Sequence, residues 1–481
     1  MPYALAALCA LLFAATPAAA QIALPDLGGT ADATLPPQLE RRIGEDLMRE
    51  IRYRDPDYVD DAEVTEYLNL LGGRLVAVAP DVRQAFDFFV IRDGSINAFA
   101  LPGGFIGVNT GLIISSSSES ELASVLAHEI AHVTQRHIAR MVGAREQMQV
   151  PMIAATIAAI LLGASRPDLG AGAGAAVQGL GVQTQLNYTR AFEREADRIG
   201  FQMLAGAGFD PRAMAAFFDK LQRATAVMDD AAVPGYLRTH PMSIERMTDA
   251  QNRAQNLRYR QTPDSLEYHL VRAKLRADAG DAQGAVAFFG GLLRDRRFAS
   301  ETATRYGLAR ALLRMRHVAD AQAEIDALRA EKAASSMIDM LAAEARRAAG
   351  DDAGALAILE AARVRYPQRR SVLYATVEAL QRLGRDAQAL AALEEPLRLY
   401  RSDAALHALQ AKSYAALGKR LLQHKAQAEV YALRGALPAA IEQLELARSA
   451  GDGDFYQLSQ VDARLRDLRA AHAQKVRDQR R

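Results

Sequence analysis

Cysteine is almost absent from this chain, since its 481 residues include a single one, Cys9. It lies within an apolar run, Met1 to Ala20, that ends in an Ala-x-Ala pattern and predicts a secretory signal peptide over residues 1–20. Leu8 stands where a lipoprotein signal needs a small residue, so lipidation is not expected. The exported chain would contain no cysteine, which excludes a disulfide framework and a zinc site built from thiolates.

An excess of charge of either sign is also missing. The chain has 58 Lys and Arg against 57 Asp and Glu, a net charge of +1, so no nucleic-acid partner is expected. Half of the residues are apolar and 24% are charged, which is typical of globular proteins. Because 481 residues exceed the usual size of one domain, we expect two or three domains.

A hydrophobic run of membrane-spanning length is lacking after the signal peptide. The apolar segment Pro151 to Ala164 is too short to span a bilayer comfortably and indicates a buried or groove-lining segment. The alternative is a flap that contacts a substrate or a membrane surface, which leaves peripheral membrane contact open. The Gly-rich run from Gly170 to Gly181 follows no predicted strand, so low complexity explains it better than a phosphate-binding loop.

The elements predicted after residue 20 are a linker, two helices and a small sheet. Residues 21–39 are rich in Pro, Gly, Ala, Asp and Thr, which predicts the linker. Helical patterns run from about Glu40 to Tyr53 and from about Asp61 to Val78. Short apolar or β-rich runs separated by turn residues then predict strands connected by hairpins, at Phe86 to Ile91, Ile96 to Leu101 and Phe105 to Asn109.

Two histidines and a glutamate form an H-E-x-x-H motif, at His128, Glu129 and His132. Ser118 and Glu121 fit a capping box, which predicts a helix that carries the motif about two turns from its start. Residues four apart share a helix face, so both imidazoles can reach one zinc ion while Glu129 addresses a water. The alternative interpretation is an exposed, polar helix face.

A hydrolytic zinc site takes three protein ligands and keeps one position for water. The sequence offers Glu193 as the third ligand, and Asp197 lies four residues later on the same helix face. Asp197 would accept a hydrogen bond from a ligating histidine and fix its tautomer; a solvated acidic face is the alternative. His137, five residues after His132, is rotated off the metal face of a continuous helix, and we leave it out of the site.

After about Thr262 the pattern changes to Ala-rich amphipathic helices that repeat. Gly350, Gly384 and Gly418 are 34 residues apart, and Arg316 stands one period before Gly350. An alanine follows five residues after each of four turns, where paired helices must approach closely, at Ala285, Ala321, Ala355 and Ala389. This period and pattern predict tetratricopeptide repeats over residues 263–470.

The end of the repeat region departs from the pattern. The unit after Gly418 is irregular, and a last helix is predicted from about Asp454 to Ala470. Residues 471–481 are polar and basic, which predicts a solvated tail. We therefore expect a mainly α chain, with an α+β metallopeptidase domain over residues 40–262 followed by an α-solenoid.

These motifs resemble the gluzincin peptidases that include the CAAX prenyl protease and the heat-shock protease HtpX. In that family H-E-x-x-H is followed by E-x-x-x-D on a second helix, and here Glu193 comes 61 residues after His132. Further segments also look like family motifs, namely Asn97-Ala98-Phe99-Ala100, Pro102-Gly103-Gly104, and Thr239-His240-Pro241 with Arg246. The signal peptide and the repeats narrow the resemblance to the soluble periplasmic members, and it covers nearly the whole mature chain.

The resemblance implies a zincin-type fold with one zinc ion per chain and a role for each motif. Glu129 would act as the general base. His240 would donate a hydrogen bond to the oxyanion, or alternatively take the fourth zinc position and keep the enzyme latent. Arg246 would orient the peptide or the site. The edge strand that carries residues 97–100 would bind an extended substrate by adding it to the sheet.

The function expected from these features is that of a periplasmic zinc endopeptidase. Its substrates would be misfolded or misassembled proteins, outer-membrane proteins among them, and its repeats would dock substrate or assembly machinery. One alternative is a chaperone or adaptor that acts mainly through the repeats, with a latent peptidase site. A weaker alternative is a membrane-surface peptidase anchored by Pro151 to Ala164.

Overall fold

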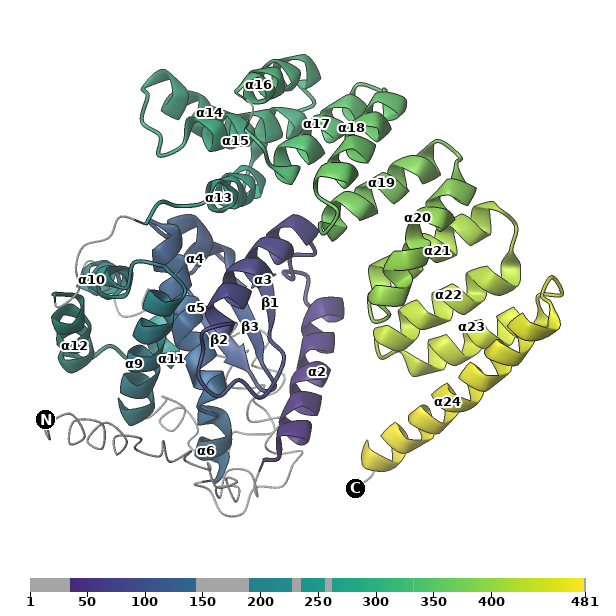
Figure 1. The fold of residues 1–481 in the computed structure, drawn as a ribbon, viewed down its shortest axis with the longest axis horizontal. Helices are drawn as coiled ribbons and strands as arrows, with labels where there is room; N and C mark the ends of the chain where they lie inside the picture. The colour runs from purple at the N-terminus through teal and green to yellow at the C-terminus, as the bar shows by residue number, and fades with distance from the viewer. Residues whose placement is uncertain (1–34, 144–189, 227–234, 256–261, 332, 480–481) are drawn as a thin grey trace, which may run out of the picture.

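A computed structural model of the chain describes residues 35–143, 190–226, 235–255, 262–331 and 333–479 (Figure 1). The predicted signal peptide, the segment Pro151 to Ala164 and the Gly-rich run after it lie outside these residues. A mainly helical region with a three-stranded sheet comes first and paired helices follow, as predicted from the sequence. Among the described helices, none is long and apolar enough to cross a membrane.

The described part of the first region contains nine helices. Residues 37–39 of the predicted linker are helical, because a proline fits the first position of a helix and Pro37 starts α2. Asp61 caps α3 by accepting hydrogen bonds from the amides of Glu63 and Val64. The helices are α2 (Pro37–Arg54), α3 (Ala62–Val76), α4 (Thr110–Ser115), α5 (Glu119–Thr134), α6 (His137–Gly143), α9 (Arg190–Gly206), α10 (Arg212–Ala226), α11 (Gly235–Thr239) and α12 (Ile244–Gln255).

The sheet contains β1 (Asp87–Ile91), β2 (Ala98–Leu101) and β3 (Phe105–Asn109) in the order β1-β3-β2. β2 and β3 form the predicted antiparallel hairpin. Its turn needs Gly103 and Gly104, whose φ angles are 77° and 89°. β1 pairs with β3 in parallel, so the prediction of a hairpin between the first two strands is wrong.

The loop between β1 and β2 explains that difference. The carbonyl of Asp93 accepts hydrogen bonds from Thr110 Oγ1 (2.9 Å) and from the amide of Gly111 (2.8 Å). Asn109 Nδ2 donates to Ser95 Oγ at 2.9 Å. These bonds tie the loop to the start of α4, so β2 is carried past β1 to the far edge of β3.

The helix α5 forms the centre of the first region. Ser118 caps it as predicted, because its Oγ accepts a hydrogen bond from the amide of Glu121 at 3.1 Å. α5 is buried along its length from Glu119 to Val133 and contacts the sheet, α3, α9 and α10. A helix buried on all faces is held in a fixed position by the core.

Residues at the beginning of the repeat region also bind the start of α5. The amide of Glu119 donates to Asp264 Oδ1 at 2.7 Å. Ser265 donates from its hydroxyl to Glu119 Oε1 (2.7 Å) and from its amide to Glu119 Oε2 (3.0 Å). Tyr268 adds a bond from its hydroxyl to the carbonyl of Ser116. The first amide of α5 is thereby satisfied by a residue that leads into the repeats.

The paired helices have the predicted repeat. The predicted turn positions Gly280, Arg316, Gly350, Gly384 and Gly418 all have positive φ, between 61° and 82°. The four alanines expected at close helix contacts are buried. The helices are α13 (Leu266–Asp278), α14 (Ala282–Arg294), α15 (Glu301–Arg314), α16 (Val318–Ala330), α17 (Ser336–Ala348), α18 (Asp352–Arg365), α19 (Arg370–Arg382), α20 (Asp386–Leu399), α21 (Ala404–Ala416), α22 (Arg420–Leu433), α23 (Leu437–Ser449) and α24 (Phe455–Gln479).

The end of α24 corrects one prediction. The helix continues to Gln479, so residues 471–479 of the predicted tail are helical. The segment contains good helix formers such as Ala471, Gln474 and Lys475, and residues 471–477 lie largely exposed, as a solvated helix end does.

The repeats arch around the first region from α13 to α24 (Figure 1). α13, at the start of the arch, and α19, near its middle, contact α3. There Lys274 bridges Asp61 and Glu63. Near its far end, the guanidinium of Arg434 lies 5.1 Å from the ring centroid of Tyr53 on α2. The repeats therefore touch the first region at the start, in the middle and near the far end of the arch.

Candidate metal centre

Four buried side chains converge on one point beside α5. They are His128, His132, Glu193 and His240, and one ligand atom from each lies within 4.8 Å of all the others. His128 Nε2 is 2.9 Å from His132 Nε2 and 3.3 Å from His240 Nδ1. Glu193 Oε1 is 3.1 Å from His240 Nδ1 and 3.4 Å from His132 Nε2. Each of the four residues is at most 1% exposed.

The packing of α9 against α5 delivers Glu193 to the two histidines. A Cβ atom at Gly200 would lie 3.2 Å from the backbone nitrogen of His128, so the glycine permits this close approach. Glu193 lies two turns earlier on α9, on the face that meets the histidines. The second helix predicted to carry the third ligand is therefore present and in contact with α5.

His240 reaches the group from the end of α11. Its ring stacks on Tyr236, with centroids 4.6 Å apart and an angle of 29° between the planes. The amide of Tyr236 donates to the carbonyl of Ile96 at 3.1 Å, which fixes α11 beside the sheet. His240 Nε2 also lies 3.4 Å from Glu129 Oε1. One imidazole thus faces both the donor group and the predicted base.

The donor group fits a zinc ion. Two ligands of one tetrahedral zinc lie about 3.3 Å apart when each bond is about 2.0–2.1 Å long. The four separations given above run from 2.9 to 3.4 Å, and all the ligand atoms lie within 4.8 Å of one another. Imidazole nitrogens and one carboxylate are the ligands that zinc takes in peptidases.

Asp197 and Arg246 form hydrogen bonds and ion pairs with residues of the donor group. Asp197 Oδ1 lies 2.9 Å from His128 Nδ1, the contact predicted from the sequence. The guanidinium of Arg246 donates to both oxygens of Asp197, at 2.7 and 2.8 Å. Its Nη1 lies 2.7 Å from Glu193 Oε2. Of the two roles predicted for Arg246, its geometry favours orienting the site rather than the peptide.

His137 also belongs to this site, although the sequence analysis excluded it. Its Nδ1 lies 2.7 Å from His132 Nδ1. α5 ends at Thr134, and Arg136 has a φ of 53°, which turns the chain before α6 begins. The exclusion assumed one continuous helix. The spacing His132 to His137 gave no local signal of this turn.

The surroundings of the site shift the pKa values of His128 and His132 in opposite directions. Burial favours neutral His128, but Asp197 and Glu193 outweigh it and raise the pKa of His128 to about 9. Burial and the charge of His128 hold the pKa of His132 well below its usual range. Burial would raise the pKa of Glu193, yet His240 and His128 hold it well below its usual range. A cation that binds this group must displace the proton of His128.

The predicted substrate segment, Asn97 to Ala100, lies on the edge of the sheet. β2 is an outer strand, as expected, and it contacts α5. Asn97 stands just before β2, and all four side chains are buried, with at most 3% exposed. Only the backbone edge of this segment could therefore meet an extended chain.

Known proteins are similar to this sequence over most of its length. Residues 64–254 match the model described as Peptidase family M48. The beta-barrel assembly-enhancing proteases of Yersinia pestis and of Escherichia coli (strain K12) are each 32% identical over 457 residues, which are 94% and 93% of this chain and 92% and 91% of those proteins. The chain belongs to peptidase family M48. A Vibrio cholerae relative is 44% identical over 278 residues, which are 57% of this chain and 57% of that protein.

Membership of family M48 makes the chain a metalloendopeptidase with a buried metal-binding group. The family match covers residues 64–254, a range that includes every candidate site residue from Asn97 to Arg246. The similarity to the beta-barrel assembly-enhancing proteases continues through the repeats, since it covers more than nine tenths of each chain.

Proposed function

We propose that this M48 peptidase is a zinc-dependent endopeptidase of the periplasm that cleaves misfolded or misassembled proteins, outer-membrane proteins among them. The observation that carries the proposal is the convergence of His128, His132, Glu193 and His240 around one point, beside Glu129. The apolar run at residues 1–20 supports export. The name of the relatives, beta-barrel assembly-enhancing protease, supports the substrate class.

Glu129 is suited to general base catalysis. Zinc, when bound, supplies a Lewis acid that polarises the scissile carbonyl and acidifies water. Glu129 takes the proton of the attacking water and delivers it to the leaving amine. Both of its oxygens are buried without a hydrogen-bond partner among the described residues, and burial raises its pKa against the opposing charge of His240. A carboxylate with these properties can accept a proton and give it back.

His240 is suited to the latent form of the enzyme. Its Nδ1 stands among the donors, so the chain itself offers four ligands and leaves a tetrahedral zinc no position for water. This placement favours the fourth-ligand interpretation over the oxyanion one. In the proposed function, a client that draws His240 away opens the site.

The latency leads to a testable prediction for His240→Ala. We expect basal hydrolysis of unfolded casein to rise by about an order of magnitude, because the blocked form no longer dominates the population. The rate is compared at equal zinc content with that of His472→Ala, the same change at a half-buried position near the end of α24. Loss of hydrolysis with zinc retained would assign His240 to the oxyanion instead.

The edge of β2 supports binding of extended, unfolded segments. A strand that adds to a sheet is held through backbone hydrogen bonds, so many different sequences can bind. The side chains of residues 97–100 are buried and offer no pockets for selection. Selection of substrates is thus left to another part of the molecule.

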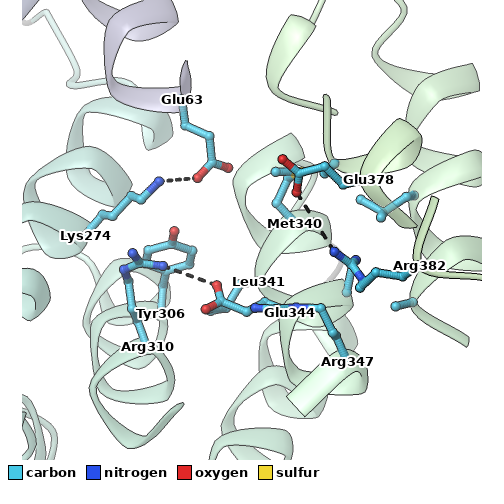
Figure 2. Close-up of a pocket in the computed structure, with 14 residues that line it drawn as sticks. Glu63, Lys274, Tyr306, Arg310, Met340, Leu341, Glu344, Arg347, Glu378 and Arg382 are labelled. Carbon is cyan, nitrogen blue, oxygen red and sulfur yellow. Dashed lines mark hydrogen bonds and ion pairs between the residues drawn. The ribbon is translucent and has the colours of Figure 1, made fainter. Parts of the chain in front are cut away.

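The repeats supply a pocket for that selection. A pocket of about 320 Å³ lies where α13 to α19 meet α3 (Figure 2). Its lining joins apolar Met340 and Leu341 to charged Glu344 and Arg347. Glu63 Oε1, from α3, is buried there without a hydrogen-bond partner in the described structure. Such a mixture suits a protein segment, which brings both amide donors and side chains, and supports docking of substrate or assembly machinery.

Metal removal tests the peptidase part of the proposal. Treating the full chain with a strong chelator is expected to abolish casein hydrolysis, and one equivalent of zinc per chain should restore it. The metal content is measured alongside the rate. Hydrolysis that survives complete removal of the metal would overturn the zinc mechanism.

Turnover in cells tests the substrate class. Misassembled outer-membrane proteins should accumulate in a strain that lacks the chain. The wild type should clear them, whereas Glu129→Gln should not. Clearance by the inactive variant would favour the adaptor alternative, in which the repeats act without cleavage.

A further inference from the structure

His132 has an unusual partner behind its zinc-facing nitrogen. Its Nε2 points into the donor group, and its Nδ1 lies 2.7 Å from Nδ1 of His137. Both imidazoles are buried, with exposures of 1% and 0%. Such a distance between two ring nitrogens requires that a single proton lie between them.

His137 is itself held on three sides. Its Nε2 lies 3.3 Å from Glu195 Oε2, and Arg140 donates to the same oxygen at 2.9 Å. Its ring stacks on Phe192, with centroids 4.5 Å apart and planes 12° from parallel. The guanidinium of Arg140 lies over the ring of Phe192, 4.5 Å from its centroid. His137 therefore has a fixed position and a fixed ring plane.

The direction of each hydrogen bond follows from one requirement. To bind a cation, His132 must present Nε2 without a proton, so its proton is on Nδ1 and is donated to His137. His137 accepts through Nδ1, which places its own proton on Nε2, and that proton is donated to the carboxylate of Glu195. All three groups then have defined protonation sites.

We propose that His137 is a positioning residue for the metal: through the relay His132, His137, Glu195 it sets the tautomer and the ring orientation of the second zinc histidine. The inference rests on the zinc site of the proposed function. It assigns a role to a residue that touches neither the metal nor the substrate.

The two zinc histidines thus differ in what supports them. His128 has a carboxylate, Asp197, directly at Nδ1. His132 has a neutral imidazole there, with the carboxylate of Glu195 one residue further out. A direct carboxylate raises the basicity of its histidine more than a neutral acceptor does. The relay orients His132 and adds less negative charge to the site.

Zinc affinity of the full chain tests the relay directly, by competition with a chromophoric chelator. His137→Leu keeps an apolar side chain against Phe192 but removes both hydrogen bonds, and should weaken zinc binding by about 10–100-fold. His137→Gln can accept from His132 and donate to Glu195, and should bind zinc within about threefold of the wild type. The visible absorption of the cobalt-substituted protein should change in His137→Leu and return in His137→Gln.

A second variant remains informative if His137→Leu does not fold. Glu195 is 27% exposed on its side chain, so Glu195→Ala should fold, and it should weaken zinc binding by about threefold to tenfold. In the background of His137→Leu the same change should have no further effect, because Glu195 acts through His137. Leu393→Ala, in the core of the repeats, controls for general loss of stability and should leave zinc affinity unchanged.

The outcomes separate this inference from the proposed function. A wild-type chain that does not bind zinc would overturn the proposed function. A wild-type chain that binds zinc while His137→Leu binds it equally tightly, with an unchanged cobalt spectrum, would overturn the relay alone. Failure of His137→Gln to recover affinity, or an undiminished effect of Glu195→Ala without His137, would also contradict it.

Discussion

Glu129→Gln is expected to lower peptidase activity by roughly 10²–10⁴-fold, the usual contribution of a positioned general base. The amide has nearly the same shape as the carboxylate but cannot take a proton from water. Glu129 is not one of the four residues of the metal-binding group, and its oxygens have no hydrogen-bond partner in the described structure. Zinc content and melting temperature should therefore stay near those of the wild type.

The assay compares single-turnover hydrolysis of unfolded casein with metal content for the same preparations. Glu360→Gln is the matched control, because it makes the same chemical change on the exposed face of α18. A Glu129→Gln protein that hydrolyses casein at a tenth of the wild-type rate or faster would rule out Glu129 as the base.

Lys274→Met is expected to lower the free energy of unfolding by about 3–5 kcal/mol, as breaking a buried ion pair does. The ammonium bridges Asp61 and Glu63 between α13 and α3, and its side chain is 5% exposed. Removing it leaves two carboxylates close together, with Glu63 only 9% exposed. Urea denaturation followed by circular dichroism measures the change.

The loss should depend on pH in a defined direction. Burial raises the pKa of Glu63 even beside the charge of Lys274, and removing that charge raises it further. A carboxyl whose pKa is higher in the folded than in the unfolded state loses stability as the pH rises. The difference between Lys274→Met and the wild type should therefore be larger at pH 8 than at pH 5.

Two variants serve as controls for this ion pair. Lys412→Met, on an exposed position of α21, should change stability by no more than about 0.5 kcal/mol. Adding Glu63→Gln to Lys274→Met should recover part of the loss, because the buried charge is gone. Additive losses in the double variant would show that the three groups do not act as a unit.

Local sequence signals predicted the centre of the site well. The capping residues Ser118 and Glu121 placed the start of α5, and a spacing of four residues placed His128 and His132 on one face. The repeat period placed turns correctly even at Arg316, where the positive φ of 61° falls on a residue other than glycine. Each of these features depends on residues close together in the chain.

The features that were missed depend on contacts between distant residues. The parallel pairing of β1 with β3 is fixed by bonds from Asp93 to the start of α4, which no strand pattern reveals. His137 was missed because Arg136 turns the chain by adopting a left-handed conformation. Arginine rarely takes that conformation, so the residue type gave no warning of the turn.

The hydrogen bonds between Glu119 and the residues Asp264 and Ser265 have a consequence for how the protein unfolds. The first turn of α5 is completed by the segment that leads into the repeats, so the two parts do not lose their structure separately. If heat unfolded the repeats, or another protease removed them, the first turn of α5 would fray. Damage to the repeats would therefore also impair the peptidase site on α5, and a damaged copy would not become an unregulated protease.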